Sequence, residues 1–356
     1  MKRVFLSNNI AAKFKFEQRV DTFKVIENSN IKLSKRGDYK LIKVTKESIS
    51  TMELIDYLSQ VFKIKANDIG YAGLKDKHAL TTQYITIPKY VNIKKFQNSK
   101  RVKLEEIGYC KDRLKIGSLT SNSFEIMLED IEDFNSLKKA FENIVSNGFA
   151  NFFGYQRFGV LNDSVKKGQK IATIGKGSKN QNSKILLAAY QSKFFNEWLN
   201  RRLELSYNIQ NEIKDNLLQS LSPTLLNKIK NSNSLFKLLP GDLGYYFYRG
   251  KKDFKIVNNI NKYTNDFLSH KYHITGVLFG SRVRLSNFLA GDIERAYIDY
   301  SFNSLRGARR DAWIWARDTK IVYEKDKNIA RLFFTLPPGS YATVLLEELQ
   351  LKEFNR

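Results

Sequence analysis

The sequence has very little cysteine, little histidine and no long apolar run. Cys110 is the only cysteine in 356 residues, so no internal disulfide can form and no CxxC pair can bind zinc. His270 and His273 lack a neighbouring acidic cluster, so the sequence predicts no metal site. Polar residues interrupt the basic N-terminus, and no run matches a membrane span. We therefore expect a cytoplasmic protein with no membrane partner.

Acidic side chains are also scarce relative to basic ones. Lys and Arg total 60 against 36 Asp and Glu, which leaves a formal charge of +24. Hydrophobic residues make up 42% of the chain, which is enough for a folded core of more than one domain. An excess of positive charge on a folded protein favours a polyanionic partner, with nucleic acid first and an anionic membrane surface second.

The hydrophobic pattern predicts an α+β protein with several antiparallel strands. Alternation predicts strands over residues 23–27, 39–44, 84–88, 114–116, 123–128 and 332–336, and a hairpin over 241–257. Helical spacing predicts helices over residues 50–61, 133–145 and 183–203, and a last helix capped by Ser340. Residues 168–184 are polar and contain glycine, which is typical of a linker.

Two further motifs have ordinary alternatives. The GKGSK at residues 175–179 fails as a phosphate loop, because Gly177 stands where Ser or Thr must follow the lysine. In the segment LRGARRDAWIWARD, Arg309 and Arg310 could contact phosphate. The alternative is that the tryptophans form core and the arginines are solvated, and the two hypotheses are compatible. Cys110 is expected to be a buried thiol.

The stretch GYAGLKDKHALTTQ places one acid, Asp76, between Lys75 and Lys77 in a glycine-containing turn. A turn-capping aspartate is the structural alternative. A carboxylate repels phosphate, so a pure nucleic-acid-binding module gains nothing from it. An enzyme can use it as a nucleophile or base, while the neighbouring positive charge favours its ionised form. Asp76 is therefore the candidate catalytic residue.

Three long motifs, GYAGLKDKHALTTQ, NFFGYQRFG and LPPGSYATVLLEEL, stand in order along the chain. Together with LKIGSLTSNSFEIML, ILLAAYQSKFFNEWL and ITGVLFGS they closely resemble the TruD family of tRNA pseudouridine synthases over residues 23–349. The resemblance implies isomerisation of a uridine in tRNA, position 13 in bacterial members, to pseudouridine, without cofactor or metal. It places the family's invariant acid at Asp76, with Lys75 beside it.

The resemblance also implies roles for other residues. Phe153 takes the place of a tyrosine found in other pseudouridine synthases and would stack on the flipped base. Asn151 would hydrogen-bond near the acid or the base, and Gln156 and Arg157 would brace the loop or contact phosphate. The family's lysine before the first strand has no clear counterpart, and Lys15 or Arg19 is expected to replace it.

The family's architecture predicts a catalytic domain, an antiparallel, mixed sheet with flanking helices, over residues 1–178 and 313–356. A TRUD-type α+β insertion domain would span residues 179–312. The expected partner is tRNA, with no small-molecule cofactor, and the protein is expected to be a monomer because that partner is large. The alternatives are a non-catalytic protein that binds or folds tRNA, and a phosphoryl-transfer enzyme, for which clustered carboxylates are missing.

Overall fold

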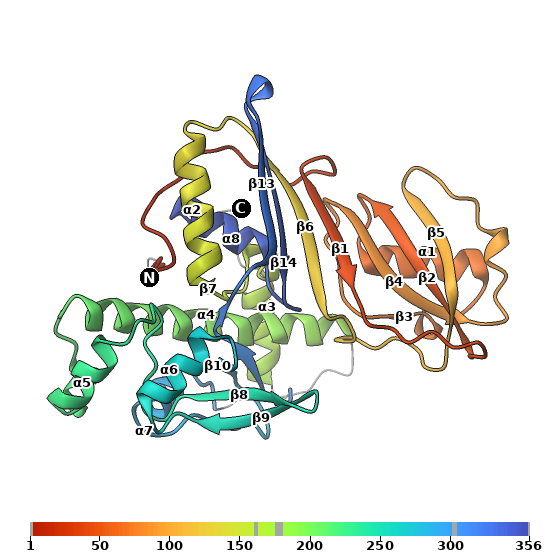
Figure 1. The fold of residues 1–356 in the computed structure, drawn as a ribbon. Coiled ribbons are helices and arrows are strands. Elements are labelled where there is room, and N and C mark those ends of the chain that lie inside the picture. The colour runs from red at the N-terminus through yellow and green to blue at the C-terminus, as the bar shows by residue number, and fades with distance from the viewer. Residues whose placement is uncertain (1–2, 160–162, 175–180, 301–304, 355–356) are drawn as a thin grey trace. The chain divides into compact units, whose positions relative to one another are not determined.

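The computed structural model of the protein describes residues 3–159, 163–174, 181–300 and 305–354 (Figure 1). The chain divides into two compact units. The first, here called the helix-rich unit, comprises Met1–Ala11, Lys139–Trp315 and Ser340–Arg356. The second, the sheet unit, comprises Ala12–Lys138 and Ala316–Gly339. This division by compactness is separate from the expected catalytic and insertion domains, which remain a prediction.

The sheet unit is built on a mixed eight-stranded sheet, in the order β13-β14-β6-β1-β4-β2-β5, with β3 beside β4. Its only parallel pair among the described residues is β1 with β4, where Lys24 lies opposite Leu80. The strands are β1 (Phe23–Asn28), β2 (Tyr39–Glu47), β3 (Gly70–Tyr71), β4 (Leu80–Pro88), β5 (Val102–Cys110), β6 (Ser121–Leu128), β13 (Arg317–Glu324) and β14 (Ile329–Leu336). The α+β class and the mixed sheet expected from the sequence are confirmed.

Helix α1 (Thr51–Phe62) covers part of this sheet. The Ser50 side chain accepts from the Glu53 amide, and the Glu53 carboxylate accepts from the Ser50 amide, so both ends of a capping box are present. Leu54, Leu58 and Ile55 are buried and pack with inward-facing residues of β2 and β4. The helix start expected from the sequence is therefore confirmed, and it fixes the backbone that precedes Thr51.

The helix-rich unit contains a four-stranded sheet in the order β11-β10-β8-β9 and a two-stranded pair of β12 with β7. The long helix α4 packs on β10, where Gly276 leaves the space that Trp198 fills (Figure 1). The helices are α2 (Phe134–Asn147, which begins in the sheet unit), α3 (Asp163–Ile174), α4 (Gln181–Gln210), α5 (Pro223–Lys230), α6 (Ile260–Leu268), α7 (Phe288–Arg295) and α8 (Ala342–Gln350). The strands are β7 (Phe149–Ala150), β8 (Leu243–Tyr248), β9 (Lys251–Ile256), β10 (Tyr272–Leu278), β11 (Ala308–Asp311) and β12 (Trp313–Ile314).

Most predicted elements are found, and three expectations are wrong. Residues 114–116 form no strand, because the Leu114 amide donates to the Thr86 side chain while the Leu114 side chain joins a small apolar cluster. Helix α8 has Tyr341 at its N-cap with no side-chain bond, so Ser340 does not cap it. Residues 168–174 belong to α3 and are no linker, while residues 175–180, with the GKGSK motif, lie outside the described residues. Cys110 is buried, as expected.

Candidate active site

Asp76 lies on the loop between β3 and β4 in the sheet unit, and its side chain is exposed. Ala72 and Ala79, toward the two ends of this loop, are completely buried. The Ala79 amide donates to the carbonyl of Lys77 at 3.0 Å, which tightens the turn after the acid. The loop therefore presents an accessible carboxylate between two buried anchor points.

The backbone beside Asp76 is held by the first residue of α1. The amide of Lys75 donates to Thr51 Oγ1 at 2.9 Å, and that hydroxyl donates to Gln83 Oε1 on β4 at 2.9 Å. Thr51 and Gln83 are buried, so water does not compete for these bonds. One hydroxyl thus links the loop, the helix start and the neighbouring strand.

The two lysines that flank Asp76 are each paired with a glutamate. Lys75 Nζ forms a short ion pair with Glu27 Oε2, and the side chains are 5% and 0% exposed. Glu27 Oε1 also accepts from the Tyr84 amide at 3.3 Å. Lys77 pairs with Glu53 at the surface at 2.6 Å. This pairing, with hydrogen bonds from Ser50, lowers the pKa of Glu53 to about 2.

The sequence reasoning missed Lys46, a buried cation behind the same loop. Lys46 is 0% exposed, and its ammonium donates to the carbonyl of Ile49 and, at 3.4 Å, to the carbonyl of Asp76. Burial lowers the pKa of Lys46 to about 8, although the attraction of Asp76 opposes that fall. Lys46 thus supplies positive charge beneath the acid and joins its loop to the β2–α1 connection.

Arg19, one of the two residues considered in place of the family's lysine, is paired with three acidic side chains. Its guanidinium bonds Glu17 at 2.9 Å, Asp21 at 3.3 Å and Glu129 at 2.9 Å. Lys15 forms a backbone bridge with Glu129 in the same neighbourhood. The ammonium of Lys46 contacts the carbonyl of Asp76 at 3.4 Å.

A second group of expected residues, in the helix-rich unit, surrounds Phe153. The guanidinium of Arg310 lies over the Phe153 ring at 3.9 Å and donates to the Asn151 side-chain oxygen at 2.8 Å. Asn151, which is buried, donates in turn to the carbonyl of Asp311 at 2.9 Å. Asn196 bonds both the amide and the carbonyl of Phe153 at 2.9 Å. The half-buried ring is therefore fixed by its backbone and by the cation over it.

Burial lowers the pKa of Arg310 to about 10, which leaves it charged at neutral pH. Arg157 lies 5.6 Å from the centre of the Phe153 ring and donates to the Ser192 hydroxyl at 3.1 Å. The Gln156 side-chain oxygen accepts from Thr343 at 3.2 Å. Both side chains therefore form hydrogen bonds within the helix-rich unit, Gln156 to Thr343 and Arg157 to Ser192.

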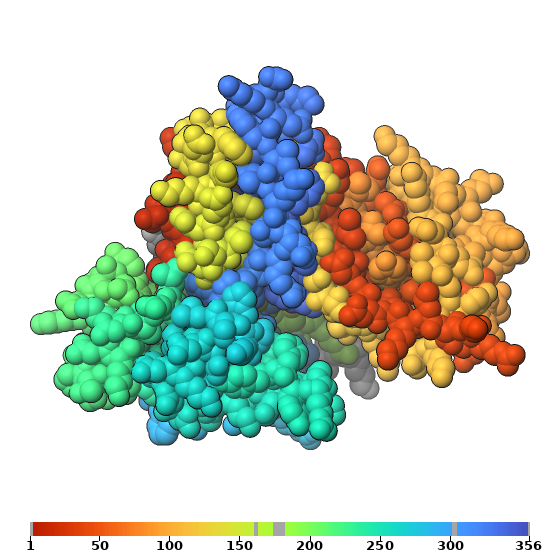
Figure 2. Space-filling view, in the orientation of Figure 1, coloured from red at the N-terminus to blue at the C-terminus, as the bar shows by residue number. Residues whose placement is uncertain are grey.

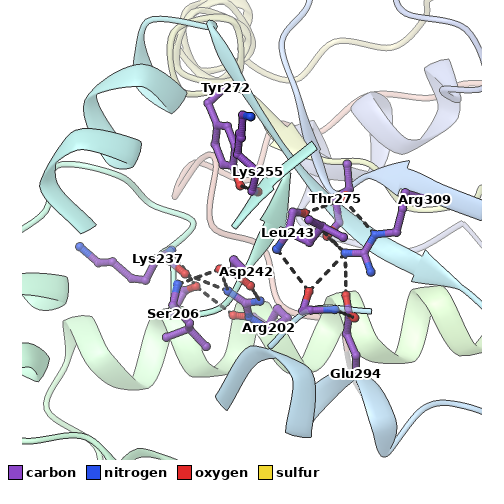
Figure 3. Close-up of polar contacts among 12 residues, drawn as sticks. Arg202, Ser206, Lys237, Asp242, Leu243, Lys255, Tyr272, Thr275, Glu294 and Arg309 are labelled. Atoms are coloured by element: carbon purple, nitrogen blue, oxygen red, sulfur yellow. Dashed lines mark hydrogen bonds and ion pairs between the residues drawn. The ribbon is translucent and has the colours of Figure 1, made fainter. Parts of the chain in front are cut away.

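Arg309 is placed differently from its neighbour Arg310. Its side chain is only 5% exposed and pairs with Glu294 at 2.7 Å, and it also donates to the carbonyl of Thr275 at 2.7 Å (Figure 3). The guanidinium of Arg309 thus donates its hydrogen bonds to acceptors within the protein. This placement argues against the phosphate contact expected of Arg309 and gives it a structural role. Trp313, in contrast, is core, as the alternative hypothesis expected.

No cluster of three or more histidine, cysteine or carboxylate side chains suited to a metal occurs in the described ranges. His270 packs on Trp315 at 4.2 Å, and His273 stacks on Tyr245 at 4.8 Å. Within those ranges, no helix combines the length and apolar character that a bilayer crossing requires.

The sequence matches the family model described as tRNA pseudouridine synthase D (TruD) over residues 2–173 and 222–349. It is 35% identical over 358 residues to the tRNA pseudouridine synthase D of a Nitratiruptor species, covering 98% of both chains. It is 33% identical over 362 residues to that of Helicobacter pylori (strain G27), covering 96% of this chain and 94% of the other.

The fold is also similar to a crystal structure described as that of a tRNA pseudouridine synthase D (TruD) from Methanosarcina mazei. The TM-score is 0.65 at 21% sequence identity, covering 99% of this chain and 97% of the other. This likeness confirms the fold, while the family match and the near-complete alignments with relatives settle the family. The chain belongs to the tRNA pseudouridine synthase D (TruD) family.

Proposed function

We propose that this protein converts uridine 13 of tRNA to pseudouridine, with Asp76 as the catalytic residue acting on a flipped-out nucleotide. As a member of its family it is a tRNA pseudouridine synthase, which is an isomerase. The observation that carries the role of Asp76 is its exposed side chain on a loop held by buried contacts of Lys75, Thr51 and Lys46. A reactive group needs this combination of access and fixed position.

The reaction redistributes bonds within one nucleotide. The bond from uracil N1 to ribose C1′ breaks, the ring turns, and a bond forms from C5 to C1′. The C5 proton leaves to solvent and N1 takes up a proton, so no oxidant or reductant is consumed. The Asp76 carboxylate serves as nucleophile toward C1′ or C6, or as base toward a ribose proton, and each route requires an accessible oxygen. The Lys46 charge beneath the loop favours an anionic Asp76.

A uracil stacked in the tRNA is out of reach of a side chain, so the nucleotide must leave the stack before reaction. We assign Phe153 as the aromatic platform for the extruded base. A phenyl ring offers stacking area without a hydroxyl group that could compete for protons. Arg310 lies against this ring at 3.9 Å and Asn151 holds Arg310, so the platform is ordered before the base arrives.

The remaining assignments follow from these contacts. Lys75 positions the Asp76 loop through Glu27, and Gln156 and Arg157 brace the Phe153 segment. The partner is tRNA, for which the formal charge of +24 supplies long-range attraction. We further propose that the protein acts as a cytoplasmic monomer without a cofactor.

The test uses tRNA transcripts carrying tritium at uracil C5, because only pseudouridine formation releases it from that carbon. We expect release by the wild-type protein, no release by Asp76→Asn, and normal release by Asp38→Asn. Asp38 is a suitable control because it is an exposed aspartate paired with a lysine in the same unit. A transcript with cytidine at position 13 tests the site and should release nothing.

Two results would refute parts of this proposal. Full activity of Asp76→Asn would remove the catalytic role of Asp76. Tight tRNA binding by the wild-type protein without tritium release from any transcript would favour a non-catalytic protein that binds or folds tRNA.

A further inference from the structure

The hairpin formed by β8 and β9 combines exposed aromatic and basic side chains at its tip. Phe247 is 58% exposed and Tyr248 is 62% exposed. They are followed by Arg249, Gly250, Lys251 and Lys252, all of which are exposed. In Figure 2 the surface of this hairpin lies on the visible face. Exposed aromatic rings next to basic side chains are the combination that binds single-stranded nucleic acid.

The backbone of the tip forms a regular two-residue turn. Arg249 and Gly250 both have positive φ, at 49° and 74°, as the two central residues of a type I′ turn require. The strands pair in full register, with Phe247 opposite Lys252 and Tyr248 opposite Lys251. Binding by this hairpin would therefore cost little ordering entropy, since its conformation is already set.

Each face of the hairpin pairs an aromatic ring with a cation. On one face Phe247 packs edge-on against His273 at 5.4 Å, and the Lys252 ammonium lies over the Tyr245 ring at 4.0 Å. On the other face Arg249 lies 5.3 Å from the centre of the Tyr248 ring. This arrangement of π-surface and positive charge matches unpaired bases joined by phosphates.

The charge at the tip remains available for a ligand. Asp253 pairs with Lys255 at 3.2 Å, and Asp311 lies 3.7 Å from Lys252. Among the described residues, neither Arg249 nor Lys251 has an acidic side chain within ion-pair distance. These two cations, unlike the buried Arg309, are directed to solvent and are suited to phosphate.

We propose that the β8–β9 hairpin binds unpaired nucleotides of the tRNA substrate, by stacking on Phe247 and Tyr248 and by phosphate contacts of Arg249 and Lys251. The proposal rests on tRNA being the substrate, as inferred above. It concerns affinity for the RNA and assigns no part in the chemical step to the hairpin. The charge of the whole chain favours RNA over a second copy of the same chain, which would repel it.

The experiment measures the affinity of the full-length protein for a fluorescein-labelled tRNA transcript by anisotropy. The variant Phe247→Ala/Tyr248→Ala should bind at least about 30-fold more weakly, because base–aromatic stacking contributes ~1–3 kcal/mol per base and both rings are removed. Tyr207→Ala is the matched control, since Tyr207 is 49% exposed on α4 in the same unit. It should bind like wild type, and single-turnover tritium release at saturating enzyme should be retained by both variants.

A charge variant tests the phosphate contacts independently. Replacing Arg249 and Lys251 by glutamine should reduce the slope of log affinity against log salt by about 1.4, because each phosphate contact to a single strand contributes ~0.7. The proposal would be overturned if the aromatic variant and the charge variant both kept the wild-type affinity, salt slope and melting temperature.

Other occupants of the hairpin have distinct signatures. Hairpin-dependent binding to phosphatidylserine vesicles, or hairpin-dependent self-association, with unchanged tRNA affinity would overturn the RNA assignment. Failure of the proposed function is separable from failure of this inference. If the wild-type protein binds tRNA through the hairpin but releases no tritium, the hairpin proposal stands and the enzymatic one falls.

Discussion

Replacing Lys46 by methionine removes a buried charge while keeping most of the side-chain volume. Lys46 is 0% exposed, and its pKa falls from 10.5 to about 8 through burial. That difference corresponds to about 3 kcal/mol, at ~1.36 kcal/mol per pKa unit, by which folding disfavours the protonated lysine. The attraction of Asp76 and Glu53 opposes the shift, and Lys75 adds to it. A chain that retains this destabilising charge beside Asp76 gains something else from it, and we infer that this is catalysis.

The sign of the pH dependence follows from proton binding. Between about pH 8 and 10.5 the unfolded lysine keeps its proton and the folded one has lost it. The unfolded state then binds more protons, so stability rises with pH in this window and the destabilisation is fully present below pH 8. From pH 7 to 9 the wild type should gain about 1 kcal/mol of unfolding free energy relative to Lys46→Met. The variant lacks the titrating group, so contributions from other residues cancel in the difference.

The assay is urea unfolding at pH 7, 8 and 9, followed by far-UV circular dichroism. Tryptophan fluorescence would report on the wrong part of the molecule, because Trp198, Trp313 and Trp315 all belong to the helix-rich unit. Lys43→Met is the control, since Lys43 lies on the same strand, is 38% exposed and pairs with Glu105. It should show no pH-dependent difference.

Activity provides the second readout for the same variant. Lys46→Met should lower single-turnover tritium release at least about tenfold at pH 7, because the cation beneath Asp76 and its bond to the loop are lost. A wild-type-to-variant stability difference that stays constant from pH 7 to 9 would refute the depressed pKa. Full activity of a folded Lys46→Met protein would refute the role in catalysis.

Three further predictions follow from the buried contacts. Glu27→Gln leaves the Lys75 ammonium buried without its counter-charge, so it should cost about 3–5 kcal/mol in urea unfolding, and a cost below about 1 kcal/mol would contradict the importance of the pair. Phe153→Ala should lower kcat/KM for tritium release by about tenfold or more while the protein stays folded, through loss of ~1–3 kcal/mol of stacking. Unchanged kcat/KM would exclude Phe153 as the platform. Arg309→Met should reduce stability, because Glu294 loses its partner, yet leave the salt slope of tRNA binding unchanged. A reduced slope would show that Arg309 contacts phosphate after all.

Local signals in the sequence predicted much of the fold. The start of α1 was predictable because Ser50 and Glu53 form a capping box that depends only on neighbouring residues. The β8–β9 hairpin was predictable from its alternation and its central glycine. Residues 114–116 misled the prediction because a short apolar run does not reveal whether its amides bond a strand or a side chain such as Thr86.

The candidate site was predictable at Asp76 and much less so around it. The motif located the loop, but the partners of its lysines lie 24 and 48 positions away along the chain. The sequence did carry a signal for Glu27 and Lys46. On its strand, Glu27 lies on the same buried face as Phe23 and Val25, and Lys46 lies on the same buried face as Val44. The alternation of each strand predicts an apolar residue at that position, and a charged residue stands there instead. A charge on a buried strand face is a search criterion for other proteins of this kind.

The order of the segments along the chain has a consequence for synthesis. The ribosome makes strand β6 about two hundred residues before its partner β14, so the nascent sheet carries an unpaired edge for much of translation. The interval along the chain is even longer for Arg3, which forms ion pairs with Glu347 at 2.5 Å and Glu348 at 2.9 Å. Each unit combines residues from the first half of the chain with residues after 315, so each is completed late in translation and exposes aggregation-prone surface until then.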